Sequence, residues 1–402
     1  MALLDQIAGL GRDARRGGYS RPVHSAAENE LREWFVAAAV QRGLLVETDR
    51  NGILWAWWGQ PGPDAVMTGS HLDSVPGGGA FDGPLGVASA FTAIDLMRER
   101  EQAPRRPLAV AVFPEEEGSR FGVACIGSRL MSGAIDPDKA RSLTDEDGNT
   151  LAEVYRANGI APEHLGQDKE RLAGIRHFVE LHIEQGRGQV NLSAPVAVAG
   201  SILGHGRWRL SFRGQGNHAG TTLMEDRADP LVAAAQAVVE LRKIAASRRG
   251  ARGTVGRIQP IPGGTNVIAS QVDVWVDVRH RDDEVTAAIV EELLAEARTI
   301  AATEGCTVAL TEESLSPTVH FDTGLSNQLL TVLGDVPVME SGAGHDAGVL
   351  AARIPTAMLF VRNPTGVSHA PEESIETADA DAGAVALADV LAHLTGATVL
   401  AD

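Results

Sequence analysis

The stretch from Thr68 to Gly83 places His71, Asp73 and Asp82 around a run of glycines, directly after an apolar segment. Imidazole and carboxylate groups are the ligands that a borderline divalent ion prefers. Glycine lets the backbone fold tightly, so ligands that are well separated in sequence can meet in one turn. The stretch is therefore either half of a metal site or a polar turn with incidental acids. In the first case the remaining ligands come from elsewhere in the chain.

Polar clusters also follow other apolar segments, namely Glu115, Glu116 and Glu117 after 108–113, His182 at the end of 178–183, and His369 after 356–361. Together with His71 and Asp82, one glutamate and the two further histidines make five ligands, which suit two ions if one carboxylate bridges. Each ion then keeps an open position for water, which is the catalytic rather than the structural pattern. Asp73 is close enough in sequence to hydrogen-bond the His71 ring and fix its tautomer.

The three consecutive glutamates allow two interpretations. A run of acids is usually a solvated charged surface, but this run ends an apolar segment and precedes Gly118. One glutamate can then bind metal while its neighbour stays unbound. The unbound carboxylate would act as a general base that activates water and later protonates a leaving amine.

A second group of polar residues has the composition of a substrate clamp. It comprises His218, Asn266 and Arg279, with His345 and Gln185 as weaker candidates. Arginine binds a carboxylate through two parallel hydrogen bonds, whereas histidine and asparagine can donate to a developing oxyanion. The alternative for Arg279 is an ordinary surface ion pair at the end of a strand.

Apolar segments that alternate with helical stretches predict an α/β fold around these groups. Strands are expected at 65–68, 108–113, 178–183 and 356–361, and helices at 25–43, at 84–99 and after Asp379. Sites in open α/β sheets form at the carboxyl ends of strands, which is where each polar cluster falls. Segments 44–48 and 53–58 flank an Asn-Gly pair and predict a hairpin, with its tryptophans in the core.

The order of elements changes from about residue 206. Expected strands at 208–212, 252–261, 270–280 and 305–311, with helices at 229–247 and 283–303, follow the β-α-β-β-α-β order of a ferredoxin-like fold. We therefore predict a large α/β metal-binding catalytic domain, residues 1–206 and 317–402, with an inserted ferredoxin-like α+β lid domain at 207–316. Metal ligands and clamp then fall in different domains, so we expect a closing motion with Gly204 and Gly206 as hinge residues.

The composition argues against several classes of partner. The formal charge of −18 disfavours nucleic acid and anionic membranes, since both require a basic face. No segment has the ~18 consecutive apolar residues of a membrane span, and the first residues lack the apolar region of a secretory signal. Cys125 and Cys306 lie far apart and indicate no disulfide framework. We expect a cytoplasmic protein that acts on a small molecule.

The chain carries six motifs: Gly69-Ser-His-Leu-Asp-Ser-Val-Pro-Gly-Gly-Gly-Ala-Phe-Asp-Gly83, Glu116-Glu-Gly-Ser-Arg-Phe121, His182-Ile-Glu-Gln-Gly186, Asn217-His-Ala-Gly-Thr-Thr222, Ser341-Gly-Ala-Gly-His-Asp-Ala347 and Ser368-His-Ala-Pro-Glu-Glu373. In this order they resemble the M20 metallopeptidase superfamily. Within it they are most similar to the branch of N-carbamoyl-L-amino-acid amidohydrolases, allantoate amidohydrolases and β-alanine synthases. The resemblance runs over nearly the whole chain, and no single motif would suffice for it.

The resemblance implies a role for each candidate residue: His71, Asp82 and His182 hold one ion, Asp82, Glu117 and His369 hold the other, Glu116 is the general acid/base, His218, Asn266, Arg279 and His345 contact substrate, and Gln185 lies near it. Asp82 is then the bridging ligand. The family often has a non-proline cis peptide after this aspartate, here Asp82–Gly83. Glu115 departs from the family pattern, in which Asn or Asp commonly precedes the Glu-Glu pair, so the roles of Glu116 and Glu117 rest on counting back from Gly118.

The activity that the resemblance implies is hydrolysis of the C–N bond of an N-carbamoyl-L-amino acid to the amino acid, carbon dioxide and ammonia. Allantoate or N-formyl-amino-acid amidohydrolase activity is the alternative, followed by a dipeptidase or aminoacylase, or a non-catalytic metal-binding protein. The cofactor would be two divalent ions about 3.5 Å apart; Zn, Mn, Co and Ni all suit these ligands. The family also implies a substrate with a free carboxylate and a homodimer joined through the small domain. In some members a residue matching His218 or Asn266 reaches the partner's site.

Overall fold

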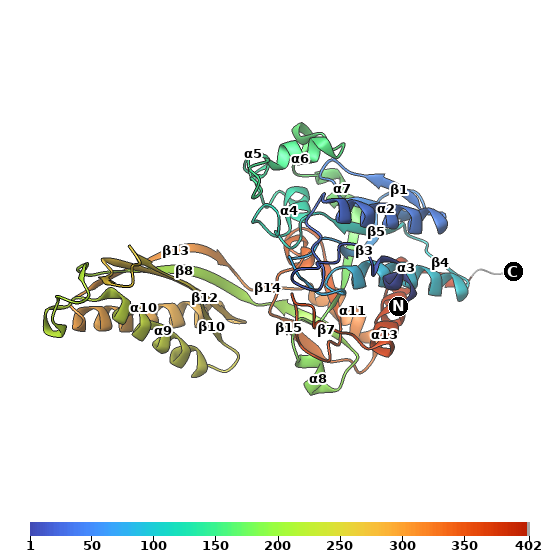
Figure 1. Ribbon diagram of the computed structural model, residues 1–402. Coiled ribbons are helices and arrows are strands. Elements are labelled where there is room, and N and C mark those ends of the chain that lie inside the picture. The colour runs from blue at the N-terminus through green and yellow to red at the C-terminus, as the bar shows by residue number, and fades with distance from the viewer. Residues whose placement is uncertain (400–402) are drawn as a thin grey trace. The chain divides into compact units, whose positions relative to one another are not determined.

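The computed structural model describes residues 1–399, and the chain divides into two compact units (Figure 1). The first unit comprises Met1–Gly200 and the described part of His320–Asp402, and the second comprises Ser201–Val319. The predicted insertion, 207–316, lies inside the second unit. Over the described part of the chain, no helix is both long and apolar enough to cross a membrane.

The first unit is built on a nine-stranded sheet. Its strands run in the order β1 (Leu45–Thr48), β2 (Leu54–Trp58), β5 (Leu108–Phe113), β3 (Ala65–His71), β6 (Ile175–Ile183), β16 (Thr356–Val361), β7 (Val196–Ile202) and β14 (Val319–His320), with β15 (Val338–Ser341) also paired to β7. The four central strands β5, β3, β6 and β16 are parallel, so their carboxyl ends lie at one edge of the sheet. Nearly every residue of these strands is buried, as expected for parallel strands covered on both faces. Each candidate metal ligand lies at or just beyond this edge.

Helices cover the central sheet, and their apolar side chains pack against its strands to form the core of the first unit. The long ones are α2 (Ala26–Gln41), α3 (Pro84–Glu99), α11 (Thr323–Leu333) and α13 (Thr377–Thr395), whose apolar side chains join one buried cluster with the strands. The short ones are α1 (Ala2–Ile7), α4 (Ile126–Ser132), α5 (Pro137–Arg141), α6 (Leu151–Ala157), α7 (Lys169–Gly174), α8 (Gly188–Leu192), α12 (Asp346–Leu350) and the 3-10 turn Pro162–His164. The strands β4 (Gln102–Ala103) and β17 (Thr398–Val399) form a separate pair.

The predicted hairpin is present. β1 and β2 pair antiparallel across the turn at Asp49–Gly52, and Asp49 accepts hydrogen bonds from the backbone of Asn51 and Ile53. Trp55 is fully buried and Trp57 is 2% exposed, which confirms the expected core position for these two, whereas Trp58 is partly buried and packs against the core.

The second unit has the ferredoxin-like topology. Its antiparallel sheet runs in the order β10 (Arg252–Ile261), β12 (Gln271–His280), β8 (Gly204–Arg213) and β13 (Thr307–Ser316). The helices α9 (Pro230–Ala246) and α10 (Asp283–Thr303) pack with this sheet around a separate apolar core (Figure 1). A two-stranded sheet joins β9 (Asn217–His218) to β11 (Val267–Ile268), and Met224–Asp226 forms a 3-10 turn.

The predicted hinge glycines have a different role. Gly204 and Gly206 lie inside β8, paired with His280 and Val278 of β12. A Cβ atom at Gly206 would overlap the ring of Trp208, and one at Gly204 would overlap the carboxylate of Asp283. Strand pairing fixes the backbone here, so the prediction that these glycines supply hinge flexibility is wrong; glycine is needed for space.

Candidate metal centre

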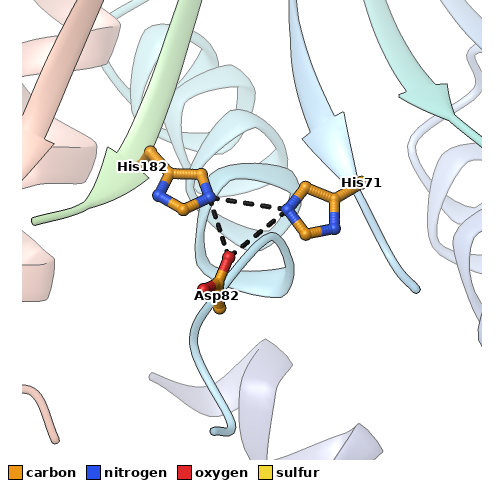
Figure 2. Close-up of side chains that lie close together, drawn as sticks. All are labelled: His71, Asp82 and His182. Atoms are coloured by element: carbon orange, nitrogen blue, oxygen red, sulfur yellow. Dashed lines mark hydrogen bonds and ion pairs between the residues drawn. The ribbon is translucent and has the colours of Figure 1, made fainter. Parts of the chain in front are cut away.

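Two histidines and one aspartate converge at the edge of the central sheet (Figure 2). His71 ends β3, His182 lies at the end of β6, and Asp82 precedes α3. Oδ1 of Asp82 lies 3.4 Å from Nε2 of His71 and 3.1 Å from Nε2 of His182, and the two Nε2 atoms are 3.5 Å apart. Three ligand atoms therefore face one common point.

The other oxygen of Asp82 belongs to a second group. Nε2 of His369 lies 3.4 Å from Oδ2 of Asp82 and 3.3 Å from Oε2 of Glu117. In each group the ligand atoms all lie within 4.8 Å of one another. Asp82 thus directs one oxygen to each group, which is the arrangement of a bridging carboxylate.

The chemistry of these groups fits divalent ions. The donors are imidazole nitrogens and carboxylate oxygens, with an open side for further ligands because His369 is exposed. Within residues 1–399, Oε1 of Glu117 is buried without a hydrogen-bond partner, which leaves this carboxylate with a free acceptor for a cation. Burial and the nearby Asp82 charge raise the pKa of Glu117 to about 7. A bound cation would offset both effects and keep Glu117 ionised.

Backbone carbonyls orient both buried imidazoles. Nδ1 of His71 lies 3.0 Å from the carbonyl oxygen of Asp73, and Nδ1 of His182 lies 2.9 Å from that of Ile183. An Nδ1–H that donates to a carbonyl leaves Nε2 with its lone pair toward the metal. For His71 the hydrogen-bond acceptor is therefore the Asp73 carbonyl, while the nearer carboxylate oxygen of Asp73 is 3.6 Å away.

The carboxylate of Asp73 instead holds the glutamate run. Its two oxygens accept hydrogen bonds from the backbone N–H groups of Glu116, at 3.2 Å, and Glu117, at 3.1 Å. One aspartate thereby ties the loop after β3 to the loop after β5. The relative position of His71 and the two glutamates depends on this link.

The three glutamates have different surroundings. Glu115 is fully buried, and its Oε1 accepts from the backbone of Arg120 and Phe121, so it stabilises the loop from within. Glu117 belongs to the second ligand group. Glu116 belongs to neither group, although its Oε2 lies 3.6 Å from Nε2 of His71. This geometry supports the order of roles obtained by counting back from Gly118.

Glu116 has the environment of a proton carrier. It is 6% exposed, and Cys125 donates a long hydrogen bond to its Oε1, with sulfur and oxygen 3.6 Å apart. Burial raises the pKa of Glu116 well above that of an ordinary glutamate, against the opposing effect of the nearby His71. A carboxyl group with a raised pKa can both accept and return a proton near neutral pH.

Similarity to known proteins identifies the family of this chain. A family model described as Peptidase family M20/M25/M40 matches residues 67–393. The chain belongs to this family. It is 36% identical over 379 residues to an N-carbamoyl-L-amino acid amidohydrolase from Geobacillus stearothermophilus, with 92% of each chain covered. It is 32% identical over 390 residues to an allantoate amidohydrolase from Escherichia coli (strain K12), covering 94% of this chain and 93% of the relative.

The fold of this M20-family chain also matches solved structures. An amidase of the hydantoinase/carbamoylase family from Burkholderia multivorans aligns with a TM-score of 0.87 and 30% identity, over 98% of this chain and 96% of that one. Both the fold class and the family expected from the sequence are therefore confirmed. The expected cis peptide at Asp82–Gly83 is not present: within residues 1–399 the cis bond is Ile261–Pro262.

Two weaker sequence candidates also lie at the metal centre of this M20-family chain. Nε2 of Gln185 donates to Oδ2 of Asp82 at 2.8 Å and to Oγ of Ser368 at 3.1 Å. The ring of His345 is buried with its centroid 4.5 Å from that of His182. Burial, reinforced by His182, holds the pKa of His345 well below its usual range, so it stays neutral and can donate from one nitrogen.

The remaining clamp candidates belong to the second unit. His218 and Asn266 are exposed and close together: His218 pairs with Val267, and the carbonyl of Asn266 accepts from the backbone of Ala219. Arg279 lies on β12, where its Nε and Nη2 donate to the carboxylate of Asp277 at 2.7 and 3.0 Å. The ion pair weighed as an alternative from the sequence therefore exists, and it holds the plane of the guanidinium.

Sequence reasoning missed three buried acids around the centre. Glu180 accepts hydrogen bonds from Ser70 Oγ and the backbone of Ala347, both at 2.9 Å. Asp346 accepts a hydrogen bond from Ser128, and Glu373 accepts from the backbone before α3. Burial raises the pKa of all three. The available signal was position: Glu180 precedes His182 by two residues on a strand, Asp346 follows His345, and Glu373 ends the motif of His369.

Proposed function

We propose that this protein is a binuclear metal-dependent amidohydrolase that cleaves the C–N bond of an N-carbamoyl-L-amino acid. The products would be the free amino acid, carbon dioxide and ammonia. The observation that carries the proposal is the position of Asp82, whose two oxygens face two separate ligand groups while Glu116 stays outside both. Relatives named N-carbamoyl-L-amino-acid amidohydrolases that align over most of the chain support this substrate class.

The protein's own residues divide the work as follows. Divalent ions held there would supply Lewis-acid chemistry. Glu116 would accept a proton from the attacking water at its carboxylate and later donate it to the departing nitrogen. His71, Asp82 and His182 would hold one ion, and Asp82, Glu117 and His369 the other; Zn, Mn, Co and Ni are all compatible with these ligands. Neutral His345 would donate a hydrogen bond to the oxyanion.

Arg279 is the proposed reader of the substrate carboxylate, with His218 and Asn266 as further substrate ligands. A guanidinium held in plane by Asp277 loses less freedom when it binds a second carboxylate. Arg279→Ala should raise KM strongly for substrates with a free carboxylate and change it little for the amidated analogues. Equal losses for both substrate types would assign Arg279 a structural role instead.

Allantoate is the second candidate substrate. Relatives named allantoate amidohydrolases align at 32 to 34% identity, close to the values for the carbamoyl relatives. Allantoate also combines a carboxylate with ureido groups, so the same metals, base and clamp would serve. N-formyl-L-amino acids are a third possibility by the same chemistry.

A substrate panel tests the proposal. Protein stripped of metal by a chelator would be reloaded with Zn²⁺, Mn²⁺, Co²⁺ or Ni²⁺ and assayed with N-carbamoyl-, N-formyl- and N-acetyl-L-amino acids and allantoate. We expect the highest kcat/KM on an N-carbamoyl-L-amino acid and none without metal. Preference for allantoate would support the second candidate. No turnover of any compound with two ions bound would favour a non-catalytic metal-binding protein.

We further propose a homodimer joined through the second unit, in a reducing compartment such as the cytoplasm. The second unit exposes large apolar side chains, including Leu223 at 62%, Met224 at 75% and Val239 at 52%, and exposed apolar groups of this kind mark interaction surfaces. Both cysteines are free and buried, which favours a reducing environment. Light scattering of the protein in solution would measure the mass, and a monomer at micromolar concentration would contradict the dimer.

A further inference from the structure

A buried glutamate holds the backbone of the candidate bridging ligand. Glu373 lies between β16 and α13 and is 6% exposed. Its Oε1 accepts hydrogen bonds from the backbone N–H of Phe81, at 2.9 Å, and of Asp82, at 3.1 Å. Two donors that converge on one carboxylate oxygen fix the direction in which the Asp82 side chain leaves the backbone.

The chain leaves space for this carboxylate. A Cβ atom at Gly79 would overlap Oε1 and the carboxyl carbon of Glu373. Gly79 is not among the glycines with positive φ, so its backbone does not require glycine. Glycine is needed at this position because the Glu373 side chain occupies the place where a side chain would be.

The same loop touches Asp82 a second time. Ser368 donates to Oδ2 of Asp82 at 3.2 Å, and His369 follows directly as a candidate ligand of the second ion. The loop 368–373 therefore contacts both the backbone and the side chain of Asp82. A shift of Glu373 would move the bridging carboxylate relative to His369.

We propose that Glu373 is a positioning residue of the metal centre, which sets the orientation of Asp82 so that its two oxygens reach both ligand groups. Gly79 has no side chain and therefore leaves the space that the Glu373 carboxylate occupies. The inference rests on the proposed binuclear function. Glu372, the preceding residue of the same motif, is exposed, and its backbone carbonyl accepts a hydrogen bond from Thr365 in the loop, so it provides a matched control.

Metal affinity tests this role directly. Full-length protein freed of metal would be titrated with Zn²⁺ against a chromophoric chelator, and with Co²⁺ while its visible absorption is recorded. We expect Glu373→Leu and Gly79→Ala to weaken metal binding about 10- to 100-fold and to change the Co²⁺ spectrum, because loss of an outer hydrogen-bond partner of a metal ligand has effects of this size. Glu373→Gln keeps an acceptor oxygen and should recover part of the affinity, and Glu372→Gln should match the wild type.

Turnover separates positioning from a general loss of structure. Excess metal should restore kcat in Glu373→Gln with unchanged KM, because Glu373 acts through Asp82. The proposal would be overturned if folded Glu373→Leu and Gly79→Ala had the metal affinity and Co²⁺ spectrum of the wild type. It would also be overturned if the metal-free variants had a lower Tm while their metal affinity was unchanged, because Glu373 would then have only a structural role. If Glu373→Leu does not fold, Gly79→Ala and Glu373→Gln decide by the same measurements. Wild-type protein that binds two ions but hydrolyses no substrate would contradict only the proposed function.

Discussion

At the residue scale, the adjacent carboxylates of Glu116 and Glu117 have different surroundings. Glu117 faces Asp82 and His369, whereas Glu116 faces His71 and Cys125. Glu116→Gln should keep both ions and lose turnover by about 10²- to 10⁴-fold, because it removes the proton carrier with little change of shape. Glu117→Gln should lose metal as well. Metal analysis and kcat of the two variants, measured side by side, check this division.

The neighbouring glutamate supplies the control for that experiment. The side chain of Glu115 is buried and accepts hydrogen bonds from backbone groups of its own loop, so Glu115→Gln should reduce stability more than it alters kcat at saturating metal. If Glu116→Gln loses an ion while Glu117→Gln keeps both, the roles assigned by counting back from Gly118 are reversed.

Site residues could be predicted from the sequence where the residue type itself suggests metal binding. They could not be predicted where the role depends on burial in the fold. His71, Asp82 and His369 stand out because imidazole and carboxylate groups follow apolar segments. Glu180 and Glu373 have the same side chain as many surface glutamates, and only the fold surrounds them with backbone donors. Similarly, the sequence cannot show that His71 is oriented by the backbone carbonyl of Asp73, rather than by the side-chain carboxylate of the same residue as we expected.

At the element scale, β3 must lie close to β5 for the two ligand-bearing loops to meet. Gly69 of β3 pairs with Ala111 of β5 with φ 147°, and a Cβ atom there would overlap the carbonyl oxygen of Ala111. Gly69→Ala should lower the free energy of unfolding by about 3 kcal/mol, the combined effect of steric overlap and backbone strain. Urea unfolding of the metal-free protein measures this change.

A glycine elsewhere separates the two effects. Gly148 also has positive φ, at 83°, but a Cβ atom there would meet nothing within 4 Å. Gly148→Ala should therefore cost only the strain of the left-handed conformation, about 1 to 2 kcal/mol. If Gly69→Ala and Gly148→Ala lowered the free energy of unfolding equally, β3 and β5 could move apart to make room for the Cβ atom without a measurable loss of stability.

Elements with strong internal periodicity were predictable, whereas three strands at one side of the large sheet were missed. The strands β5 and β16 occupy the residues expected from their apolar runs, and α3 does as well. The strands β7, β14 and β15 were missed, although β7 pairs antiparallel with β16. A two-residue strand such as β14 has no periodicity of its own, so its conformation depends on partners that are distant in sequence.

The start of α2 carries a pH-sensitive contact. His24 is 8% exposed, its backbone donates to Glu28, and its ring meets Tyr155 edge-on at 5.0 Å. Burial, with the nearby charge of Arg32, lowers the pKa of His24 to about 3. The unfolded chain takes up the proton below about pH 6.5 and the folded chain does not, so stability falls as pH drops toward 3, by about 1.4 kcal/mol per unit.

Comparison of variants isolates this contribution from other titrating groups. Between pH 7.5 and 5.0, metal-free wild type should lose about 2 kcal/mol more unfolding free energy than His24→Gln, because about 1.5 units of that interval lie below the unfolded pKa. His164→Gln, at an exposed position on a 3-10 turn, is the matched histidine variant. If unfolding free energy changed with pH equally in wild type and His24→Gln, then His24 would take up its proton in the folded protein as readily as in the unfolded chain.

At the scale of the whole molecule, the metal centre and the inserted unit belong to different cores. All five candidate ligands lie in the first unit, at the ends of β3 and β6 or on the segments after β3, β5 and β16, and the second unit has its own buried cluster. Ions that bind only the folded state stabilise it by about 2.7 kcal/mol when their free concentration is about 100 times Kd. Because the ions join four segments of one core, this stabilisation should act on the first unit alone.

Calorimetry with and without a chelator tests whether the two cores unfold separately. We expect two transitions, one of which moves several degrees lower when the metal is removed, while the other keeps its Tm because none of the candidate ligands lies in Ser201–Val319. A titration of Zn²⁺ into metal-free protein should raise the sensitive transition in proportion to the logarithm of the free metal concentration. A single transition that shifts as a whole would mean that the units unfold together, and the stabilising effect of the metal would then extend to the inserted unit.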